Sequence, residues 1–240
     1  MSEQKFARTE LIIGQEGLQK LKNSKVAVLG VGGVGSYTVE ALARAGIGSL
    51  VLVDFDVVDA TNINRQLHAL HNSVGKVKVE LMAERVKLIN PDISVTTIQE
   101  FYTPENGDEI LDSSLDYVVD AIDTVTNKLD LIKRCVTSNI PVVASMGAGN
   151  KIDPTAFKVG DISETSVCPL AKVVRRELRK AGINQGVKVV YSTEPAIKPA
   201  VDLSTPLKKQ APGSISFVPA TAGLILASVV VRDLLLKSKY

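Results

Sequence analysis

A glycine-rich segment between a strand-like run and a helix-like run constrains the fold of this chain more than any other feature. Lys25–Leu29 is a short apolar run typical of a buried strand, and Val34–Ala45 has the apolar spacing of a helix. Between them and at the start of the helix lie Gly30, Gly32, Gly33 and Gly35. Glycines there permit a tight turn and let the backbone approach phosphate groups, which the helix N-terminus attracts. The segment therefore predicts a phosphate-binding strand–turn–helix unit.

The rest of the first half alternates between strand-like and helix-like runs, which favours an α/β fold with a parallel sheet. The expected strands after the first unit are Ser49–Val53, Ile93–Ile98, Asp116–Ile122 and Pro141–Ser145. The expected helices are Val74–Ile89 and Val125–Ser138. We expect a Rossmann-like, mostly parallel sheet flanked by helices.

After Gly149 the pattern changes, and one amphipathic helix (Pro169–Ala181) and a terminal apolar helix stand out. We expect this part to extend the same sheet, with an antiparallel arrangement as one option. The prediction is a single domain over residues 1–240, with a nucleotide-binding half (1–150) and a substrate-side extension (151–240).

Composition excludes several classes of protein. The two cysteines, Cys135 and Cys168, form no CxxC pair, so no cysteine cluster for zinc and no disulfide framework is expected, as in a cytoplasmic protein. The N-terminus lacks the apolar core of a signal peptide. The apolar tract Ala220–Val231 is short for a membrane span, so we interpret it as a buried helix and consider membrane attachment unfavoured. The net charge of +2 indicates no partner by itself.

The segment Asp54–Gln66 indicates which nucleotide binds. Asp54 ends the second strand at the distance expected of a ribose ligand, and the loop beyond it carries Asp56, Asn62, Arg65 and Gln66. Hydride transfer has no evident use for cations there, so an NAD oxidoreductase is disfavoured. Transfer of adenylate from ATP does require cations there, because the departing pyrophosphate carries negative charge that cations stabilise.

Two further residues complete this predicted site. Lys78, on the next helix, is close enough in sequence to join Arg65 at the triphosphate. Asp123 follows the fourth strand, at the edge where open α/β sheets bind ligands, and a carboxylate beside a triphosphate is a natural Mg²⁺ ligand. The sequence therefore predicts an enzyme that uses ATP and Mg²⁺ to activate a carboxylate as an acyl-adenylate.

The glycine loop, the Asp54–Gln66 segment, Lys78 and the Asp120–Asp123 pair resemble the ubiquitin-activating-enzyme-like superfamily, over roughly residues 8 to 146. The resemblance implies that Asp54 binds the ribose, that Asn62, Arg65 and Lys78 bind phosphates, and that Asp123 holds Mg²⁺. It also implies a homodimer, in which Arg8 enters the ATP site of the partner. From the sequence alone Arg8 is only an exposed charge at a helix start.

The second half is similar to the family of tRNA threonylcarbamoyladenosine dehydratases, in the segments that begin at Cys168, Tyr191 and Gly213. This similarity implies a tRNA substrate whose threonylcarbamoyl carboxylate is activated with ATP and then cyclised with net loss of water. A basic face on the Pro169–Ala181 helix supports an RNA substrate independently, through contacts with backbone phosphates. Its members are Lys172, Arg175, Arg176, Arg179 and Lys180.

Two alternatives stay open at this point. One is an adenylyltransferase for a ubiquitin-like sulfur-carrier protein, with a sulfur-transfer or carrier protein as partner; the missing zinc cysteines count against it. The other is a nucleotide sensor without catalysis. Cys168 is interpreted as an ordinary cysteine before a helix rather than a nucleophile, and Cys135, His68 and His71 as structural residues.

Overall fold

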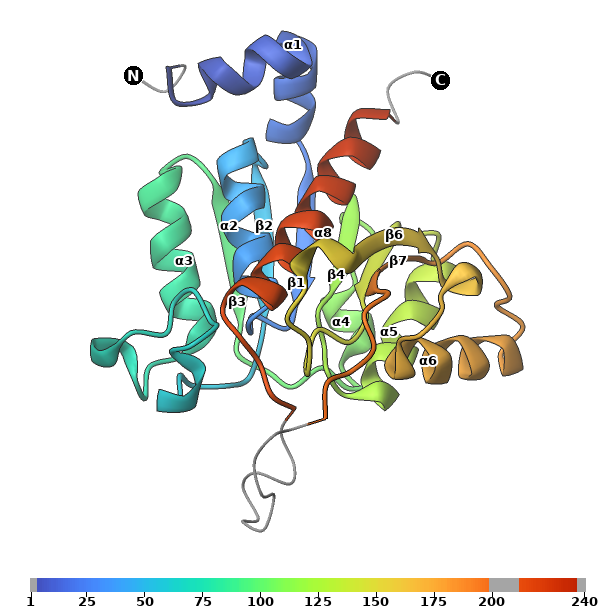
Figure 1. Cartoon of the computed structure of the whole chain (residues 1–240). Coiled ribbons are helices and arrows are strands. Elements are labelled where there is room, and N and C mark those ends of the chain that lie inside the picture. The colour runs from blue at the N-terminus through green and yellow to red at the C-terminus, as the bar shows by residue number, and fades with distance from the viewer. Residues whose placement is uncertain (1–3, 199–211, 237–240) are drawn as a thin grey trace.

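A computed structural model describes residues 4–198 and 212–236 (Figure 1). The seven strands are β1 (Lys25–Leu29), β2 (Ser49–Val53), β3 (Ser94–Ile98), β4 (Tyr117–Asp120), β5 (Val142–Ser145), β6 (Phe157–Asp161) and β7 (Lys188–Ser192). The α-helices in these residues are α1 (Ala7–Lys22), α2 (Gly35–Ala45), α3 (Lys78–Ile89), α4 (Gly107–Ile110), α5 (Val125–Thr137), α6 (Pro169–Lys180) and α8 (Phe217–Leu236). Short 3₁₀ turns are η1 (Gln4–Phe6), η2 (Ala60–Asn62), η3 (His71–Ser73), η4 (Pro154–Ala156) and η5 (Ile162–Glu164).

The strands form one sheet in the order β3-β2-β1-β4-β5-β7-β6. Every neighbouring pair is parallel except β6 and β7, which run antiparallel at the edge. This arrangement confirms the predicted Rossmann-like fold and its extension by the second half. The extension is mixed, because β7 joins β5 in parallel and only β6 is reversed.

Close backbone packing explains two of the glycines at the first strand–helix turn. Gly30 has a φ of 86°, and a Cβ there would lie 2.6 Å from the carbonyl oxygen of Ala121. A Cβ on Gly35 would lie 1.8 Å from the carbonyl oxygen of Gly30. Larger residues would push the turn away from β4, so these glycines hold the start of α2 against the carboxyl end of the sheet.

The terminal helix α8 lies across one face of the sheet beside α2 (Figure 1). It runs for 20 residues and is longer than the apolar tract suggested, because Phe217–Pro219 and Arg232–Leu236 also join it. By length and composition it could cross a membrane, yet half of its most apolar window is buried within the protein. Thr38 Oγ1 donates to the carbonyl of Gly223 at 3.0 Å, which ties α8 to α2. We therefore interpret α8 as a core helix.

One predicted boundary is wrong in a way that matters for the site. The helix expected to start at Val74 begins at Lys78. Gly75 has a φ of 85°, and Val77 pairs with Val57 in an isolated antiparallel bridge, so the chain is extended just before the helix. Lys78 consequently stands in the first turn of α3, next to the segment that follows β2.

Candidate functional site

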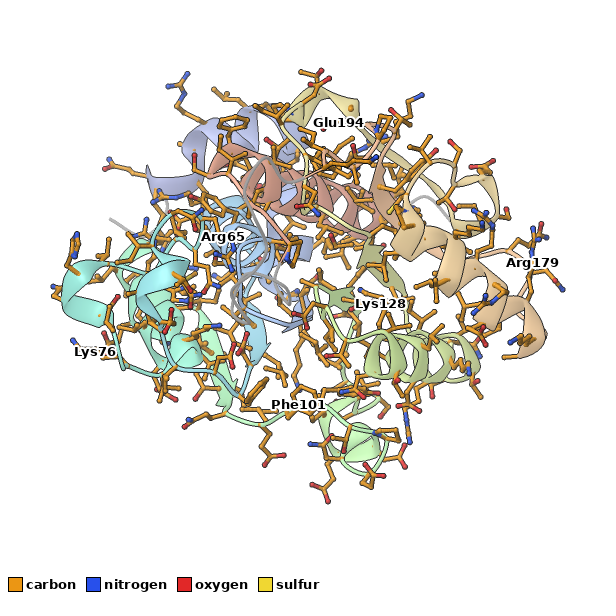
Figure 2. All side chains as sticks on the ribbon, turned by 60° about the horizontal axis from the view of Figure 1, so that its bottom comes forward. Arg65, Lys76, Phe101, Lys128, Arg179 and Glu194 are labelled. Atoms are coloured by element: carbon orange, nitrogen blue, oxygen red, sulfur yellow. The ribbon has the colours of Figure 1, made fainter. Side chains whose placement is uncertain are left out.

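A cavity of about 460 Å³ opens at the carboxyl edge of the sheet, which Figure 2 turns toward the viewer. Its walls come from the segments after β1, β2, β3, β4 and β5 and from the chain just before and within α8. Ligands bind at this edge of open α/β sheets. The lining residues that the sequence predicted are Gly30, Gly32, Gly33, Asp54, Asp56, Asn62, Arg65, Gln66, Lys78 and Asp123. Gly35 lies just behind them at the start of α2.

Asp54 connects the glycine loop to the end of β2. One carboxylate oxygen accepts the N–H of Val31 at 2.6 Å, and the other accepts the N–H of Asp56 at 2.9 Å. Burial raises the pKa of Asp54, whereas the nearby charge of Lys78 and these two hydrogen bonds lower it. The side chain thus fixes the loop at which a phosphate would lie, and its carboxylate faces the cavity as a ribose ligand must.

Lys78 is a nearly buried cation, 4% exposed, at the wall of the cavity. Its Nζ lies 2.5 Å from a carboxylate oxygen of Asp56, and its backbone N–H donates to the Asp56 carbonyl at 3.1 Å. A partly desolvated ammonium is a strong anion ligand, because water screens it little. The geometry suits binding of a phosphate oxygen beside Asp56.

The crossover segment after β2 is held by local hydrogen bonds. Asp59 caps η2, since its carboxylate accepts the N–H of Thr61, and the buried Asn62 completes the capping box because its Oδ1 accepts the N–H of Asp59. Arg65 donates to the Thr61 carbonyl at 2.9 Å and keeps other guanidinium donors available toward the cavity. The buried Gln66 Oε1 accepts no hydrogen bond from the described residues. This segment therefore presents polar groups to the cavity from a rigid backbone.

Asp123 supplies an exposed carboxylate at the opposite wall, where it accepts a hydrogen bond from Thr124 Oγ1 at 3.3 Å. No cluster of three or more His, Cys, Asp or Glu side chains suited to a metal occurs in residues 4–198 and 212–236. Mg²⁺ is commonly held by one or two carboxylates together with phosphates and waters. A single carboxylate facing the expected position of a triphosphate therefore fits Mg²⁺ better than a metal that needs an all-protein cage.

Several lining residues carry no sequence motif. Phe55 and Phe101 meet edge to face, with ring centroids 4.8 Å apart, and both rings are partly exposed at the cavity. The other lining residues outside the predicted site are Glu100, Tyr102, Asn127, Ala148, Gly149, Pro212, Ser214 and Pro219. Those before Pro212 stand just after a predicted strand or at a predicted helix start, whereas Ser214 and Pro219 belong to the segment from Gly213 whose only signal was its family similarity.

Arg8 does not reach this cavity. It is exposed in α1, which leads into the amino end of β1, whereas the cavity lies at the carboxyl ends of the strands (Figure 1). Within one copy of the chain, Arg8 and the candidate site lie at opposite edges of the sheet.

The basic face of α6 is separate from the cavity, and none of its five cations lines it. Figure 2 shows Arg179 toward the outer end of α6, well apart from Arg65. Arg175 is half-buried and donates to the backbone carbonyl and hydroxyl of Thr165, so it braces the loop before α6. The exposed members are Lys172, Arg176, Arg179 and Lys180.

The cysteines and His68 lie in the interior. Cys168 is 2% exposed and packs in a hydrophobic cluster with Ala171 and Val174, where a nucleophile would have no access to substrate. Burial raises the pKa of Cys135 to about 12. Burial, with the charge of Lys78, lowers the pKa of His68 to about 4, so its ring is neutral at pH 7. These positions fit structural roles for all three residues.

Known proteins share both the sequence and the fold of this chain. A family model described as the ThiF family matches residues 6–239. The tRNA threonylcarbamoyladenosine dehydratase of Bacillus subtilis is 52% identical over 239 residues, covering 96% of this chain and 94% of that protein. Crystal structures of the Escherichia coli enzyme in complex with ATP and with AMP superpose with TM-scores of 0.91 and 0.92, at 39% identity, over 98% of this chain and 96% of that one.

Proposed function

This chain belongs to the ThiF family, and on that basis we propose that it is an ATP-dependent enzyme that cyclises threonylcarbamoyladenosine in tRNA. The observation that carries the proposal is the cavity itself, which combines a glycine loop at a helix N-terminus with Arg65, Lys78 and Asp123. Relatives similar over nearly their whole length are named as dehydratases for this nucleoside, and one of them is seen with ATP. The tRNA substrate is inferred from those names.

The proposed reaction has two steps. First, a carboxylate oxygen of the substrate attacks the α-phosphorus of ATP, the bond to the bridging oxygen of the β-phosphate breaks, and pyrophosphate leaves. Then a nucleophile within the substrate attacks the acyl carbon, and AMP departs with the oxygen of the former carboxylate. The net change in the substrate is the loss of water. No enzyme thiol is needed, which agrees with the burial of Cys168.

The residues of the cavity suit the charge that moves in the first step. Lys78 and Arg65 stabilise negative charge that passes to the pyrophosphate, and the glycine-loop N–H groups and α2 N-terminus bind a phosphate. Asp54 orients the ribose. Asp123 would hold Mg²⁺, and the ion would neutralise phosphate charge. Asp56, which pairs with Lys78, is a further carboxylate in the same cavity.

The test is incubation of purified protein with ATP, Mg²⁺ and tRNA that carries threonylcarbamoyladenosine, followed by mass spectrometry of the nucleosides. We expect a product lighter by one water, formed together with AMP and pyrophosphate. Absence of that product would exclude the tRNA reaction. ATP–pyrophosphate exchange that depends on a carrier protein ending in Gly-Gly, and not on tRNA, would instead select the sulfur-carrier alternative.

We also propose that the protein acts in the cytoplasm as a homodimer, in which Arg8 of one copy completes the ATP site of the other. Support comes from the position of Arg8, which is exposed at the edge of the sheet opposite its own cavity. Arg8→Ala and Arg65→Ala variants should each be inactive alone. When the two variants are co-expressed, activity should return, because each mixed dimer contains one site with both arginines intact. Failure of every mixture to exceed the separate variants would contradict a shared site.

The exposed cations of α6 are proposed to contact the tRNA backbone. The triple variant Lys172→Gln, Arg176→Gln and Arg179→Gln should weaken tRNA binding. It should also reduce the salt dependence of the binding constant, by roughly 0.9 in log–log slope for each phosphate that the variant no longer neutralises. Filter binding at several salt concentrations measures both. The control Lys22→Gln, at the end of α1, should leave the slope unchanged. An unaltered slope in the triple variant would remove α6 from the interface.

A further inference from the structure

Two adjacent residues in the first turn of α5 contact the segments that form two different walls of the cavity. Asn127 is 6% exposed and Lys128 is completely buried. Asn127 contacts the segment after β3, and Lys128 contacts the end of β4. Neither belongs to the glycine loop or to the Asp54–Gln66 segment, and Figure 2 shows Lys128 on the side of the sheet that carries α5.

The Asn127 contact holds the aromatic wall. Its Nδ2 donates to the Tyr102 carbonyl at 2.6 Å in the interior. The hydroxyl of Tyr102 donates to Asp130 at 2.9 Å, one turn further along α5, and Arg134 donates to the same carboxylate at 2.8 Å. The segment after β3 is thus tied to α5 at two points.

Both ties are made by Tyr102, the residue directly after Phe101. The Phe101 ring meets Phe55 edge to face and lines the cavity with 41% of its surface exposed. An exposed aromatic face in a cavity suits a planar base, because stacking buries apolar area that is otherwise wet. A shift of the Tyr102 backbone would therefore move the surface available to a nucleobase.

The Lys128 contact holds the carboxylate wall. Its Nζ donates to Asp120 at 2.7 Å, and both side chains are completely buried. The other oxygen of Asp120 accepts the N–H of Ile122 at 3.0 Å, which fixes the turn that leads to Asp123. The same turn packs its Ala121 carbonyl against Gly30. The buried pair thereby sets where the Asp123 carboxylate stands relative to the glycine loop.

A buried ion pair is seldom retained for stability alone, because its desolvation cost approaches its Coulombic gain. We propose that Asn127 and Lys128 are positioning residues for the nucleotide, Asn127 for the wall that meets the base and Lys128 for the carboxylate that meets the metal. The inference rests on the proposed ATP site. It goes beyond that site by assigning two separable functions to neighbouring residues of one helix.

The test compares four variants with the wild type: Asn127→Leu, Tyr102→Phe, the double variant Asp120→Asn with Lys128→Gln, and the control Lys133→Met. The double variant removes both charges and so leaves no unpaired charge in the interior. Lys133 lies further along α5 and lines no part of the cavity. Dissociation constants are measured by calorimetry for ATP and for inorganic tripolyphosphate, each with Mg²⁺ and with EDTA, and thermal melting checks folding.

Asn127→Leu should raise the Kd for ATP about tenfold and leave tripolyphosphate binding unchanged, since only the base meets the aromatic wall. In the wild type, Mg²⁺ should lower the Kd of both ligands relative to EDTA. In the double variant this Mg²⁺ effect should be about tenfold smaller, the loss typical when the support of a metal ligand is removed. Tyr102→Phe, which removes only the hydroxyl tie to Asp130, should shift ATP binding in the same direction as Asn127→Leu by a smaller factor.

Wild-type dissociation constants in both Asn127→Leu and the double variant would overturn the inference. An equal change of the dissociation constants for both ligands, with and without Mg²⁺, would also overturn it, because that result indicates a general loss of structure in the site. Failure of the wild type to bind ATP would overturn the inference together with the ATP site. A wild type that binds ATP yet forms no cyclised nucleoside contradicts the proposed tRNA reaction alone, because this experiment measures nucleotide binding and not turnover.

Discussion

Arg65→Ala should lower kcat for the cyclised nucleoside by about 10³-fold, the loss typical when a cation that stabilises a transferring phosphoryl group is removed. Arg65 lines the cavity, and its own intramolecular bonds go to Thr61 and Asn64 on its short segment. The negative charge that it meets grows as pyrophosphate departs. The loss should therefore fall mainly on kcat, while the KM for ATP changes less.

Steady-state assays with saturating modified tRNA measure both constants, and thermal melting verifies that the variant is folded. Arg44→Ala is a matched control, because Arg44 is an exposed arginine that pairs with Glu40 at the last turn of α2, away from the cavity. Arg65→Lys should recover part of the rate, since it retains the charge without the fork of donors. A kcat for Arg65→Ala within a factor of about three of the wild type would remove Arg65 from the catalytic group.

Lys128→Met should destabilise the folded protein by about 3–5 kcal/mol, because it leaves the carboxylate of Asp120 buried without its counter-charge. Urea unfolding at pH 7 measures the loss. The double variant Asp120→Asn with Lys128→Met should be more stable than Lys128→Met alone, as no unpaired charge remains. If the single and double variants unfolded at the same urea concentration, the pair would not be coupled in this way.

The loss should also depend on pH. Burial raises the pKa of Asp120 even in the native pair, with Lys128 opposing the shift, and removal of Lys128 removes that opposition. An acid with a raised pKa in the folded state stabilises that state below the ordinary carboxyl pKa, and this contribution is lost as the pH rises through the folded pKa. The defect of Lys128→Met should therefore be smaller near pH 4 than at pH 7, and a defect that grows toward acid would contradict this account.

The local pattern of residues was sufficient for most of the first half. β1 and β2 begin and end as predicted, since an apolar run bounded by polar residues and glycine has few other solutions. The start of α3 was wrong because a bridge between Val57 and Val77 keeps the chain extended, and such a pairing depends on residues far apart in sequence. The individual strands β6 and β7 were not predicted, because their short runs lack a distinctive period.

The sequence by itself determined the nucleotide class, because Gly30, Asp54, Arg65 and Lys78 lie on consecutive strand–helix units whose carboxyl ends meet at one edge of a parallel sheet. Only the tertiary structure decided what completes that cavity. The Phe55–Phe101 wall, the Pro212–Pro219 segment and the ties from Asn127 and Lys128 depend on strand order and on helix packing. The tertiary structure also separated Arg8 and the α6 cations from the cavity, because residues of one chain meet only where the packing of the sheet and helices places them.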